Sequence, residues 1–427
     1  MKIVNKMLDF IYDSPSSFQA IDNIKKDLIN HGYQEYNESN NTKFEKGKKY
    51  FVTRNQTSII AFNIGESLNN PSFNIVASHS DCPSYKLKPN TVIKDKNYIK
   101  LNTEGYGGMI KNTWLDKPLS FAGRVIVKED GKLVSKLLNV KEKIMVIPNV
   151  AIHLNRDIGS KPLNQQVDLL PIISANQDFD LKVFLGEKLN VSSENIINYD
   201  LYLYPVMEGF IFDEFLSSYH LDNLECGFTS LEAFKDTFHK DSVNVYVCYD
   251  NEEVGSRTRQ GAAGHFLKDI LAKIATDLSF DLNSSLASSL MVSADNAHAI
   301  HPNHPELSDQ TNHVVMNKGI VIKYNANQSY TSDALSVALF TDILNKVNVP
   351  SQIYTNRSDL VGGGTLGSIS SSIVSILSID IGLGQLAMHS TIETAGVKDV
   401  QYMIDGLKAF YSTHINKIDE ANYILEN

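Results

Sequence analysis

The chain has 427 residues and a formal net charge of −10, from 39 Lys and Arg against 49 Asp and Glu. An acidic chain is a poor binder of nucleic acid or of anionic membrane surfaces, because both present phosphates that require a basic face. A hydrophobic fraction of 42% and a charged fraction of 21% are typical of a globular protein. Residues 1–35 are expected to form an amphipathic helix rather than a signal peptide, since Lys6, Asp9 and Asp13 interrupt the apolar residues.

Three cysteines, Cys82, Cys226 and Cys248, lie far apart in the sequence. An odd number at such spacing fits no disulfide framework and predicts a reducing, cytoplasmic location. No apolar run is long enough to span a membrane. Cys82 lies near a candidate metal motif, where both a thiolate ligand and an ordinary buried thiol are open interpretations.

The next elements are strands at Tyr50–Ile64 and Phe73–Ser78, rich in β-branched and aromatic residues. Residues 86–210 then change character, with short alternating segments punctuated by Gly, Pro and Asn. This stretch is predicted to be a β-rich domain inserted into a discontinuous one formed by residues 1–85 and 211–427.

Strand and helix patterns alternate after residue 215. The expected strands are Val243–Tyr249, Leu290–Ser293, Val314–Tyr324 and Ile373–Ile381, and the expected helices are Ala262–Leu278, Ser332–Val347 and Val400–Lys417. This alternation predicts an α/β fold with a mixed, largely parallel sheet sandwiched by helices. Ligand sites in such folds lie at the carboxyl ends of the strands.

Histidines and acidic residues recur after these apolar runs: His79, Asp81, Asp222, Glu252, Glu253, Asp295 and His389. Burying so many carboxylates together is unfavourable unless cations neutralise them. Two divalent metals would do so, and a spare carboxylate could then activate a water molecule.

The motif A-S-H-S-D-C-P contains His79 and Asp81. A ligating imidazole usually donates its other N–H to a carboxylate, so Asp81 is a candidate partner for His79. The alternative is a turn in which both residues cap a loop. In L-D-N-L-E, Asp222 could bridge two metals with its two oxygens, or could be the N-cap of a helix.

Adjacent residues in a strand or tight loop point in different directions. In D-N-E-E-V-G, Glu253 can therefore bind a metal while Glu252 acts as a general base, although paired acids are also common on solvated surfaces.

Downstream, the segment S-A-D-N-A-H-A-I-H-P-N-H-P offers Asp295 and the histidines His298, His301 and His304. Asp295 is favoured as a ligand because two divalent cations need several carboxylates. His389 can supply a last nitrogen ligand or be structural.

A glycine-rich segment, Gly362–Gly367, spells G-x-G-x-x-G and is followed by Asp380, as in a dinucleotide site. The preceding segment N-R-S-D-L-V is a poor strand, however. An oxidoreductase function would be supported by this motif alone. The loop is better interpreted as a backbone-lined wall of the active site, with Gly363 and Gly364 contacting substrate.

Taken in order, these motifs resemble the aspartyl aminopeptidase / vacuolar aminopeptidase I family of dizinc metalloaminopeptidases. The likeness covers nearly the whole chain and includes D-S-P-S-S-F, A-S-H-S-D-C-P-S-Y-K-L-K-P, N-T-W-L-D-K-P-L-S-F-A-G-R-V, L-D-N-L, D-N-E-E-V-G-S, A-D-N-A-H-A-I-H-P-N and A-M-H-S-T-I-E-T. The sequence departs from the family pattern at His220, Ser329 and Ile392 and in the glycine-rich loop, none of which is a predicted ligand or base.

The resemblance implies two Zn²⁺ per subunit, with Co²⁺ or Mn²⁺ as possible substitutes. It implies that Asp222 bridges both metals, that Glu252 is the general base and that Asp81 orients His79. The remaining implied ligands are His79 and Asp295 for one metal, and Glu253 and His389 for the other.

The resemblance also implies that the insert mediates dimerisation and that dimers assemble into a tetrahedral dodecamer. His153 would reach into a neighbour's active site, and Lys323 would lie near the side-chain pocket. The expected function is removal of N-terminal residues, acidic or neutral, from peptides with a free amine. The alternatives are a deacylase or carboxypeptidase on the same metal core, or a non-catalytic assembly protein.

Overall fold

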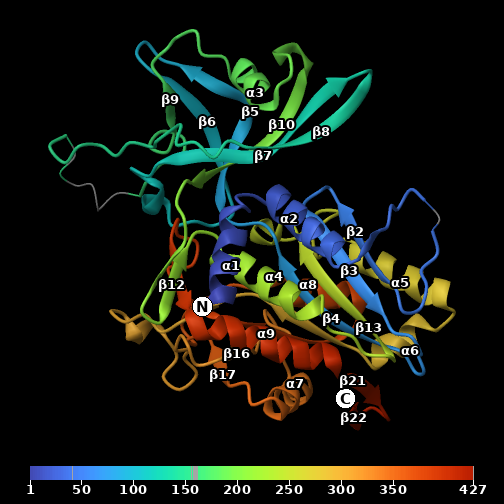
Figure 1. Ribbon diagram of the computed structural model, residues 1–427. Coiled ribbons are helices and arrows are strands. Elements are labelled where there is room, and N and C mark those ends of the chain that lie inside the picture. The colour runs from blue at the N-terminus through green and yellow to red at the C-terminus, as the bar shows by residue number, and fades with distance from the viewer. Residues whose placement is uncertain (41, 155, 157–161, 427) are drawn as a thin grey trace.

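The computed structural model describes residues 1–40, 42–154, 156 and 162–426. Figure 1 shows a smaller upper unit built on one sheet and a larger lower unit in which helices cover another. Within the described part of the chain, every helix is too short or too polar to cross a membrane.

The lower unit contains a nine-stranded mixed sheet. Its spatial order is β1 (Gln34–Glu35), β2 (Lys49–Arg54), β3 (Ser58–Ile64), β13 (Ser242–Tyr249), β4 (Ser72–His79), β14 (Leu290–Ala294), β18 (Leu377–Gly382), β16 (Ile320–Tyr324) and β17 (Ser351–Thr355). The four central strands β13, β4, β14 and β18 are parallel. The predicted largely parallel sheet is therefore confirmed, with antiparallel pairings towards both edges.

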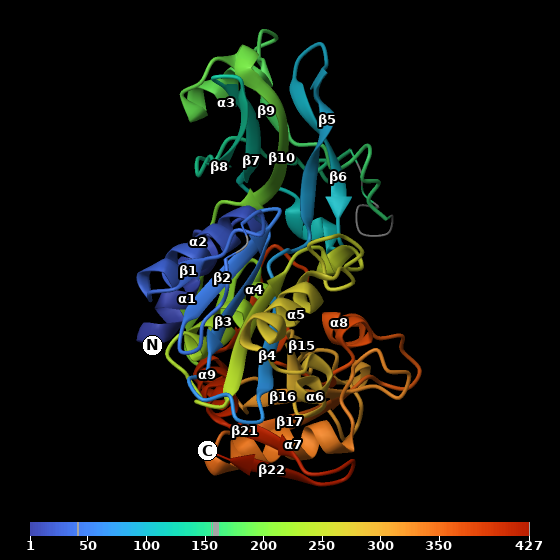
Figure 2. The same ribbon diagram turned by 90° about the vertical axis from the view of Figure 1, so that its right-hand side faces the viewer.

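Helices cover both faces of this sheet (Figure 2). One face packs against α2 (Ser17–Asn30), α4 (Leu221–Phe234), α7 (Ala334–Lys346) and α9 (Val397–Ser412). The other packs against α5 (Phe266–Leu278), α6 (Leu282–Ala287) and α8 (Leu366–Val374). Alternation along β4 serves both layers, because Val76 joins the first core and Ile75 and Ala77 join the second.

The upper unit is an antiparallel sheet with its own core. Its order is β8 (Lys132–Asn139), β7 (Leu119–Glu129), β10 (Ile196–Pro205), β5 (Ser84–Lys94), β6 (Ile99–Tyr106) and β9 (Ile172–Ser174). Helix α3 (Leu181–Leu189) packs on its core, in which Trp114 and Phe121 are buried. The domain division at residues 86 and 210 stays a prediction.

Smaller elements complete the lower unit. Helix α1 (Lys2–Tyr12) packs on α4 and α9. A five-stranded sheet contains β11 (Phe210–Phe212), β12 (Phe215–Ser218), β20 (Glu393–Gly396), β19 (Gly384–Leu386) and β15 (Ala297–His298), and β21 (His414–Lys417) pairs with β22 (Tyr423–Glu426). The three cysteines are buried free thiols.

Several predicted boundaries were wrong. The strand expected over Tyr50–Ile64 is two antiparallel strands, β2 and β3, and the helix expected from Ala262 begins at Phe266. The helix expected over 1–35 is divided between α1 and α2, because Pro15 lacks an N–H and cannot continue a helix. The strand expected from Val314 begins only at Ile320. The apolar run Ile373–Ile381 starts inside α8, since such a run does not distinguish helix from strand by period. The last helix stops at Ser412, and its expected end is strand β21.

Candidate metal centre

Three neighbouring parallel strands bring acidic and imidazole side chains to one edge of the central sheet. His79 is the last residue of β4, and Asp295 follows β14 directly. Glu252 and Glu253 lie in a short 3-10 helix just after β13. Because parallel strands end at the same edge, residues far apart in the sequence meet there.

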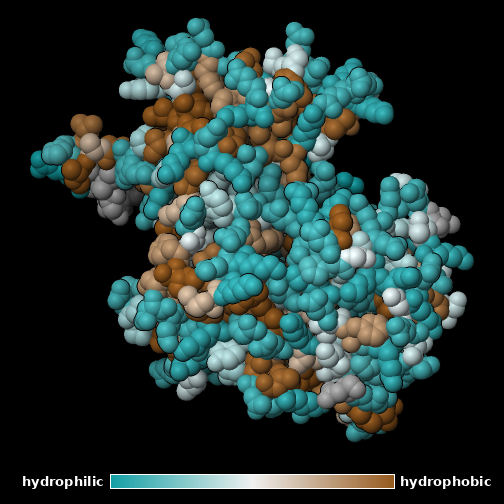
Figure 3. Space-filling view, viewed as in Figure 1, coloured by the Kyte–Doolittle hydropathy of each residue, from teal (hydrophilic) through white to brown (hydrophobic). Residues whose placement is uncertain are grey.

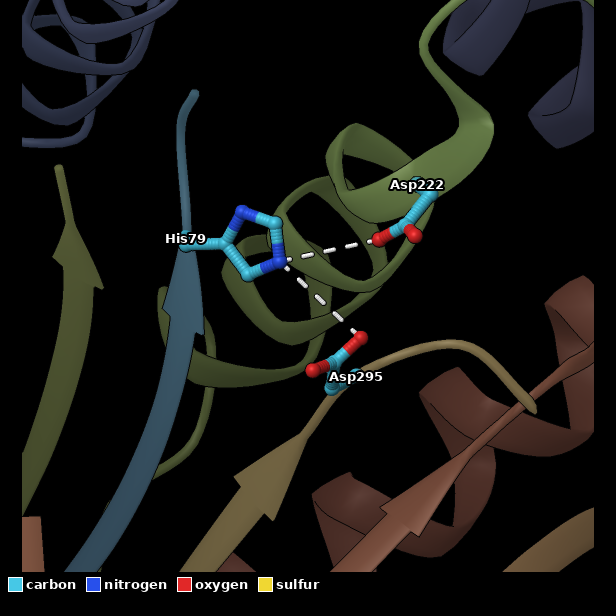
Figure 4. A group of neighbouring side chains, drawn as sticks. All are labelled: His79, Asp222 and Asp295. Carbon is cyan, nitrogen blue, oxygen red and sulfur yellow. Dashed lines mark ion pairs between the residues drawn. The ribbon is translucent and has the colours of Figure 1, made fainter. Parts of the chain in front are cut away.

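Asp222 reaches this edge from the start of α4. Its backbone (φ −82°, ψ 106°) and that of Asn223 (φ −123°, ψ 25°) are non-helical and kink the segment. The alternative of an N-cap is wrong, because His220 occupies the N-cap position and no side chain caps this helix. The carboxylate of Asp222 instead points into the site beside His79 and Asp295 (Figure 4).

The two oxygens of Asp222 face two different imidazoles. Its Oδ1 lies 3.6 Å from Nε2 of His79, and its Oδ2 lies 3.2 Å from Nε2 of His389. On either side, Asp295 Oδ1 lies 3.9 Å from the same His79 nitrogen and Glu253 Oε1 lies 3.4 Å from the same His389 nitrogen. One carboxylate thus stands between two half-sites.

Each half-site has the donors that a divalent cation needs. The donor atoms of His79, Asp222 and Asp295 lie within 4.8 Å of one another, as do those of Asp222, Glu253 and His389. His79 also forms such a group with Glu252 and Glu253. Asp222 Oδ1 and Glu253 Oε1 are buried and find no hydrogen-bond partner among the described residues. Nitrogen and carboxylate donors left unpaired in this way fit zinc.

The electrostatics of the site also favour a cation. Burial raises the pKa of Glu252 to about 8 and that of Glu253 well above its ordinary value. Although burial favours the neutral acid, Lys323 and His79 hold the pKa of Asp295 below its ordinary range. A cluster with this excess of carboxylates is stabilised by positive charge placed among them.

Asp81 lies beside His79, and its predicted role of orienting that imidazole stays a prediction. Nδ1 of His79 is nearest to the backbone carbonyl of Asp81, at 3.0 Å, and lies 3.4 Å from Oδ1. The carboxylate itself accepts the backbone N–H of Glu252 and that of Glu253, both at 3.1 Å, and the hydroxyl of Tyr106 at 2.7 Å. Its hydrogen bonds therefore go chiefly to the turn that carries the two glutamates.

A cavity of about 490 Å³ opens onto the candidate metal ligands and Glu252. Gly363, Gly364 and Lys323 all line it, as predicted for substrate contacts. Lys323 is buried, and its ammonium donates to the backbone oxygen of Asn296 at 2.7 Å.

Asp380, the acid that a dinucleotide site would use, has other partners in the structure. The carboxylate of Asp380 accepts hydrogen bonds from the hydroxyls of Thr331 and Thr365, at 2.8 and 2.6 Å. These bonds hold the start of α8, and with it the glycine-rich loop, against the cavity.

Other candidate histidines lie apart from the half-sites. His298 lines the cavity, whereas the rings of His301 and His304 lie beside each other outside it, tilted by 35° with centroids 5.3 Å apart. His153 is exposed on a loop of the upper unit and does not line the cavity of its own chain.

Glu393 is a functional candidate that sequence reasoning missed. It is buried in β20, where Oε2 accepts the backbone N–H of Asp222 at 3.0 Å and Oε1 accepts that of His389 at 2.6 Å. One carboxylate therefore holds the backbones of two candidate ligands. Its place four residues after His389 was the only available signal, and that spacing indicates no contact on a non-helical segment.

Comparisons with known proteins agree with this geometry. The profile of the family described as "Aminopeptidase I zinc metalloprotease (M18)" matches residues 10–411. A relative from Clostridium novyi (strain NT), named "Probable M18 family aminopeptidase 2", is 44% identical, and the match covers 96% of this chain and 99% of the relative. A similarly named relative from Ectopseudomonas mendocina (strain ymp) is 36% identical over 96% of this chain and 98% of its own length.

Solved structures share the fold. The chain is similar to one in the "Cryo-EM structure of the Ape4 and Nbr1 complex", with 32% identity, a TM-score of 0.91 and coverage of 95% of this chain and 85% of that one. It is also similar to the mApe1 dodecamer of S. cerevisiae, with 26% identity, a TM-score of 0.83 and coverage of 95% of both chains.

Proposed function

The chain belongs to the M18 family of zinc metalloaminopeptidases, and from this premise we propose how its residues divide the work. Asp222 would contribute to both of two Zn²⁺ sites. His79 and Asp295 would complete one site, and Glu253 and His389 would complete the other. The observation that carries this assignment is that the two oxygens of Asp222 face His79 and His389 separately, at 3.6 and 3.2 Å.

Bound zinc ions would polarise the scissile carbonyl and lower the pKa of a water molecule towards neutrality. Glu252 is then the residue that moves the proton. Its Oε2 lies 3.9 Å from Nε2 of His79, beside the proposed ligands, and no ligand role is needed from it. Its carboxylate can take a proton from that water molecule and pass it to the leaving amine.

Asp81 supports Glu252 through the backbone. Its two carboxylate oxygens accept the N–H groups of Glu252 and Glu253. These bonds fix the direction in which each glutamate leaves the turn. Asp81 is therefore a positioning residue for the base and for one ligand together.

The first residue of the substrate would lie in the cavity beside Lys323. The ammonium donates one hydrogen bond to the backbone oxygen of Asn296 and has further N–H donors. A carboxylate side chain would accept those donors, so we favour acidic first residues. Gly363 and Gly364 contribute backbone to the same wall.

We further propose a homo-oligomer, built from dimers into a tetrahedral dodecamer; the S. cerevisiae relative is described as a dodecamer. In it, His153 would enter a neighbouring active site. Support comes from its exposed loop and from the apolar neighbours Ile152 and Leu154, which are 56% and 83% exposed. Hydrophobic residues stand on the segment that projects at the left of Figure 3. A cytoplasmic location stays a prediction, consistent with three free thiols.

The test is hydrolysis of aminoacyl-anilides of Asp, Glu, Leu, Ala and Lys by metal-stripped protein restored with Zn²⁺, Co²⁺ or Mn²⁺. We expect metal-dependent release, fastest with Asp or Glu, and two metals bound per chain. An N-acetylated aspartyl-anilide is the matched control and should not be cleaved. Cleavage of the blocked compound alone would favour the deacylase, and a preference for neutral residues would refute the role given to Lys323.

A further inference from the structure

The segment that leaves β6, residues 106–113, runs from the upper unit across the metal centre; we call it the strap. Figure 2 shows β6 pointing down from the upper unit towards the lower one. We propose that the strap positions Glu253 and His389, the ligands of one metal, and leaves His79 and Asp295 to the central sheet. This inference rests on the two-metal function proposed above and adds a division of labour between its halves.

The strap contacts Glu253 directly. Gly107 has φ +74°, and a Cβ at this position would stand 3.1 Å from Cβ of Glu253 and 3.5 Å from its Oε2. A Cβ here would press on the glutamate, and the positive φ would strain any other residue. The preceding residue, Tyr106, donates its hydroxyl to Oδ2 of Asp81, the same oxygen that accepts the N–H of Glu253.

The strap also contacts the loop that carries His389. The N–H of Ile110 donates to the backbone oxygen of His389 at 3.0 Å. Two residues beyond the histidine, Thr391 donates its N–H to Oγ1 of Thr113 at 3.2 Å and its hydroxyl to the backbone oxygen of Thr113 at 2.9 Å. Gly108 passes the imidazole itself, with its Cβ position 3.9 Å from Nδ1 of His389.

The two half-sites are supported differently for a physical reason. His79 ends β4 and pairs with β13, and the N–H of Asp295, just after β14, donates to the backbone oxygen of Ile381 in β18 at 2.9 Å. The nine-stranded sheet thus holds both backbones. Glu253 and His389 lie outside the strands, and His389 has φ +67°. A ligand on a loop requires outside contacts to keep its geometry, and the strap provides them on two sides.

The chain offers a matched pair of variants for a test. Gly131, in the turn between β7 and β8, has φ +78°, close to that of Gly107, but nothing lies within 4 Å of its Cβ position. Gly107→Ala and Gly131→Ala therefore impose a similar backbone cost, and only the first pushes on Glu253. Both would be purified as full chains, and Zn²⁺ binding would be measured by equilibrium dialysis with metal analysis.

We expect wild type and Gly131→Ala to bind two zinc ions each. Gly107→Ala should bind one with unchanged affinity and the other about 10- to 100-fold more weakly, the usual cost of losing outer support for a ligand. Two unchanged sites in a folded Gly107→Ala protein would overturn the inference. Wild type binding a single zinc would instead overturn the two-metal assignment, and the strap proposal with it.

A second variant keeps the test decisive if Gly107→Ala does not fold. Thr113→Val preserves the side-chain shape and removes the hydroxyl that accepts the N–H of Thr391 and donates to the backbone oxygen of Ile110, within the strap itself. It should again weaken one site, by a smaller factor, and leave the other unchanged. Equal weakening of both sites, or of neither, would contradict the division.

Discussion

Oδ1 of Asp81 accepts the backbone N–H of Glu252 at 3.1 Å, so the acid that follows β4 holds the proposed base that follows β13. The other oxygen of Asp81 accepts the N–H of Glu253 at the same distance. A carboxylate with two acceptor oxygens suits two adjacent N–H groups, and an amide of the same shape does not.

Asp81→Asn should therefore lower kcat by about 10- to 100-fold, a typical loss for outer-shell partners. The introduced NH₂ would face an N–H donor and turn one glutamate away. Measurement of kcat together with zinc content separates this from loss of metal. Asp95→Asn, at a side chain that is 48% exposed and pairs with Lys100, is the control. Wild-type kcat in Asp81→Asn would contradict the positioning role.

Glu252→Gln should retain both zinc ions and lose activity by about 10²- to 10⁴-fold, because a glutamine cannot accept the proton. The matched comparison is Glu253→Gln, which should lose zinc as well. The donor atoms of His79, Glu252 and Glu253 also lie close enough together to hold a metal, so the experiment can reveal a ligand role for Glu252. If Glu252 is a ligand rather than the base, zinc content falls in Glu252→Gln too.

Removal of metal should make stability depend on pH. Burial raises the pKa of Glu252 from 4.5 to about 8 in the folded, metal-free chain, so the folded state binds its proton more tightly than the unfolded state does. The stabilisation of the folded state that this protonated Glu252 contributes is fully present below pH 4.5 and is lost as pH rises through 8. The raised pKa of His79, which Asp295 and Asp81 maintain against burial, acts in the same direction.

The melting temperature of metal-stripped protein should therefore fall between about pH 6 and pH 8, and that of zinc-loaded protein should change less, because cations favour the ionised carboxylates. Stripped Glu252→Gln is the control and should show a shallower fall. A stripped wild type whose melting temperature is flat or rises over this interval would refute the expected sign.

Glu393→Gln should weaken zinc binding about 10- to 100-fold, because an amide has one oxygen for the two N–H groups of Asp222 and His389 that Glu393 now accepts. Dialysis against zinc, with circular dichroism to confirm folding, measures the effect. Glu420→Gln, at a side chain that is 96% exposed, is the control. Unchanged zinc affinity in a folded Glu393→Gln protein would show that the backbone contacts do not support the ligands.

Much of this site could be predicted because its residues follow strands. An apolar run with a polar residue at its end is a local pattern, and parallel strands must end together. The sequence alone therefore predicts a shared site for His79, Glu252, Glu253 and Asp295, and the ordered motifs indicate the family. Predicted helix and strand ends were wrong where an apolar run had neither helical nor strand periodicity, as in residues 373–381.

The supporting contacts required the folded chain. Asp222 and Glu393 are 171 residues apart, and Asp81 and Glu252 are also 171 apart. No periodicity links such pairs, because hydrogen bonds between loops depend on where the sheets place them. The contact of Gly107 with Glu253 is of the same kind, since it joins the upper unit to the lower one. Residue types and their order after strands are properties of the chain, whereas the partners that hold those residues are set by packing.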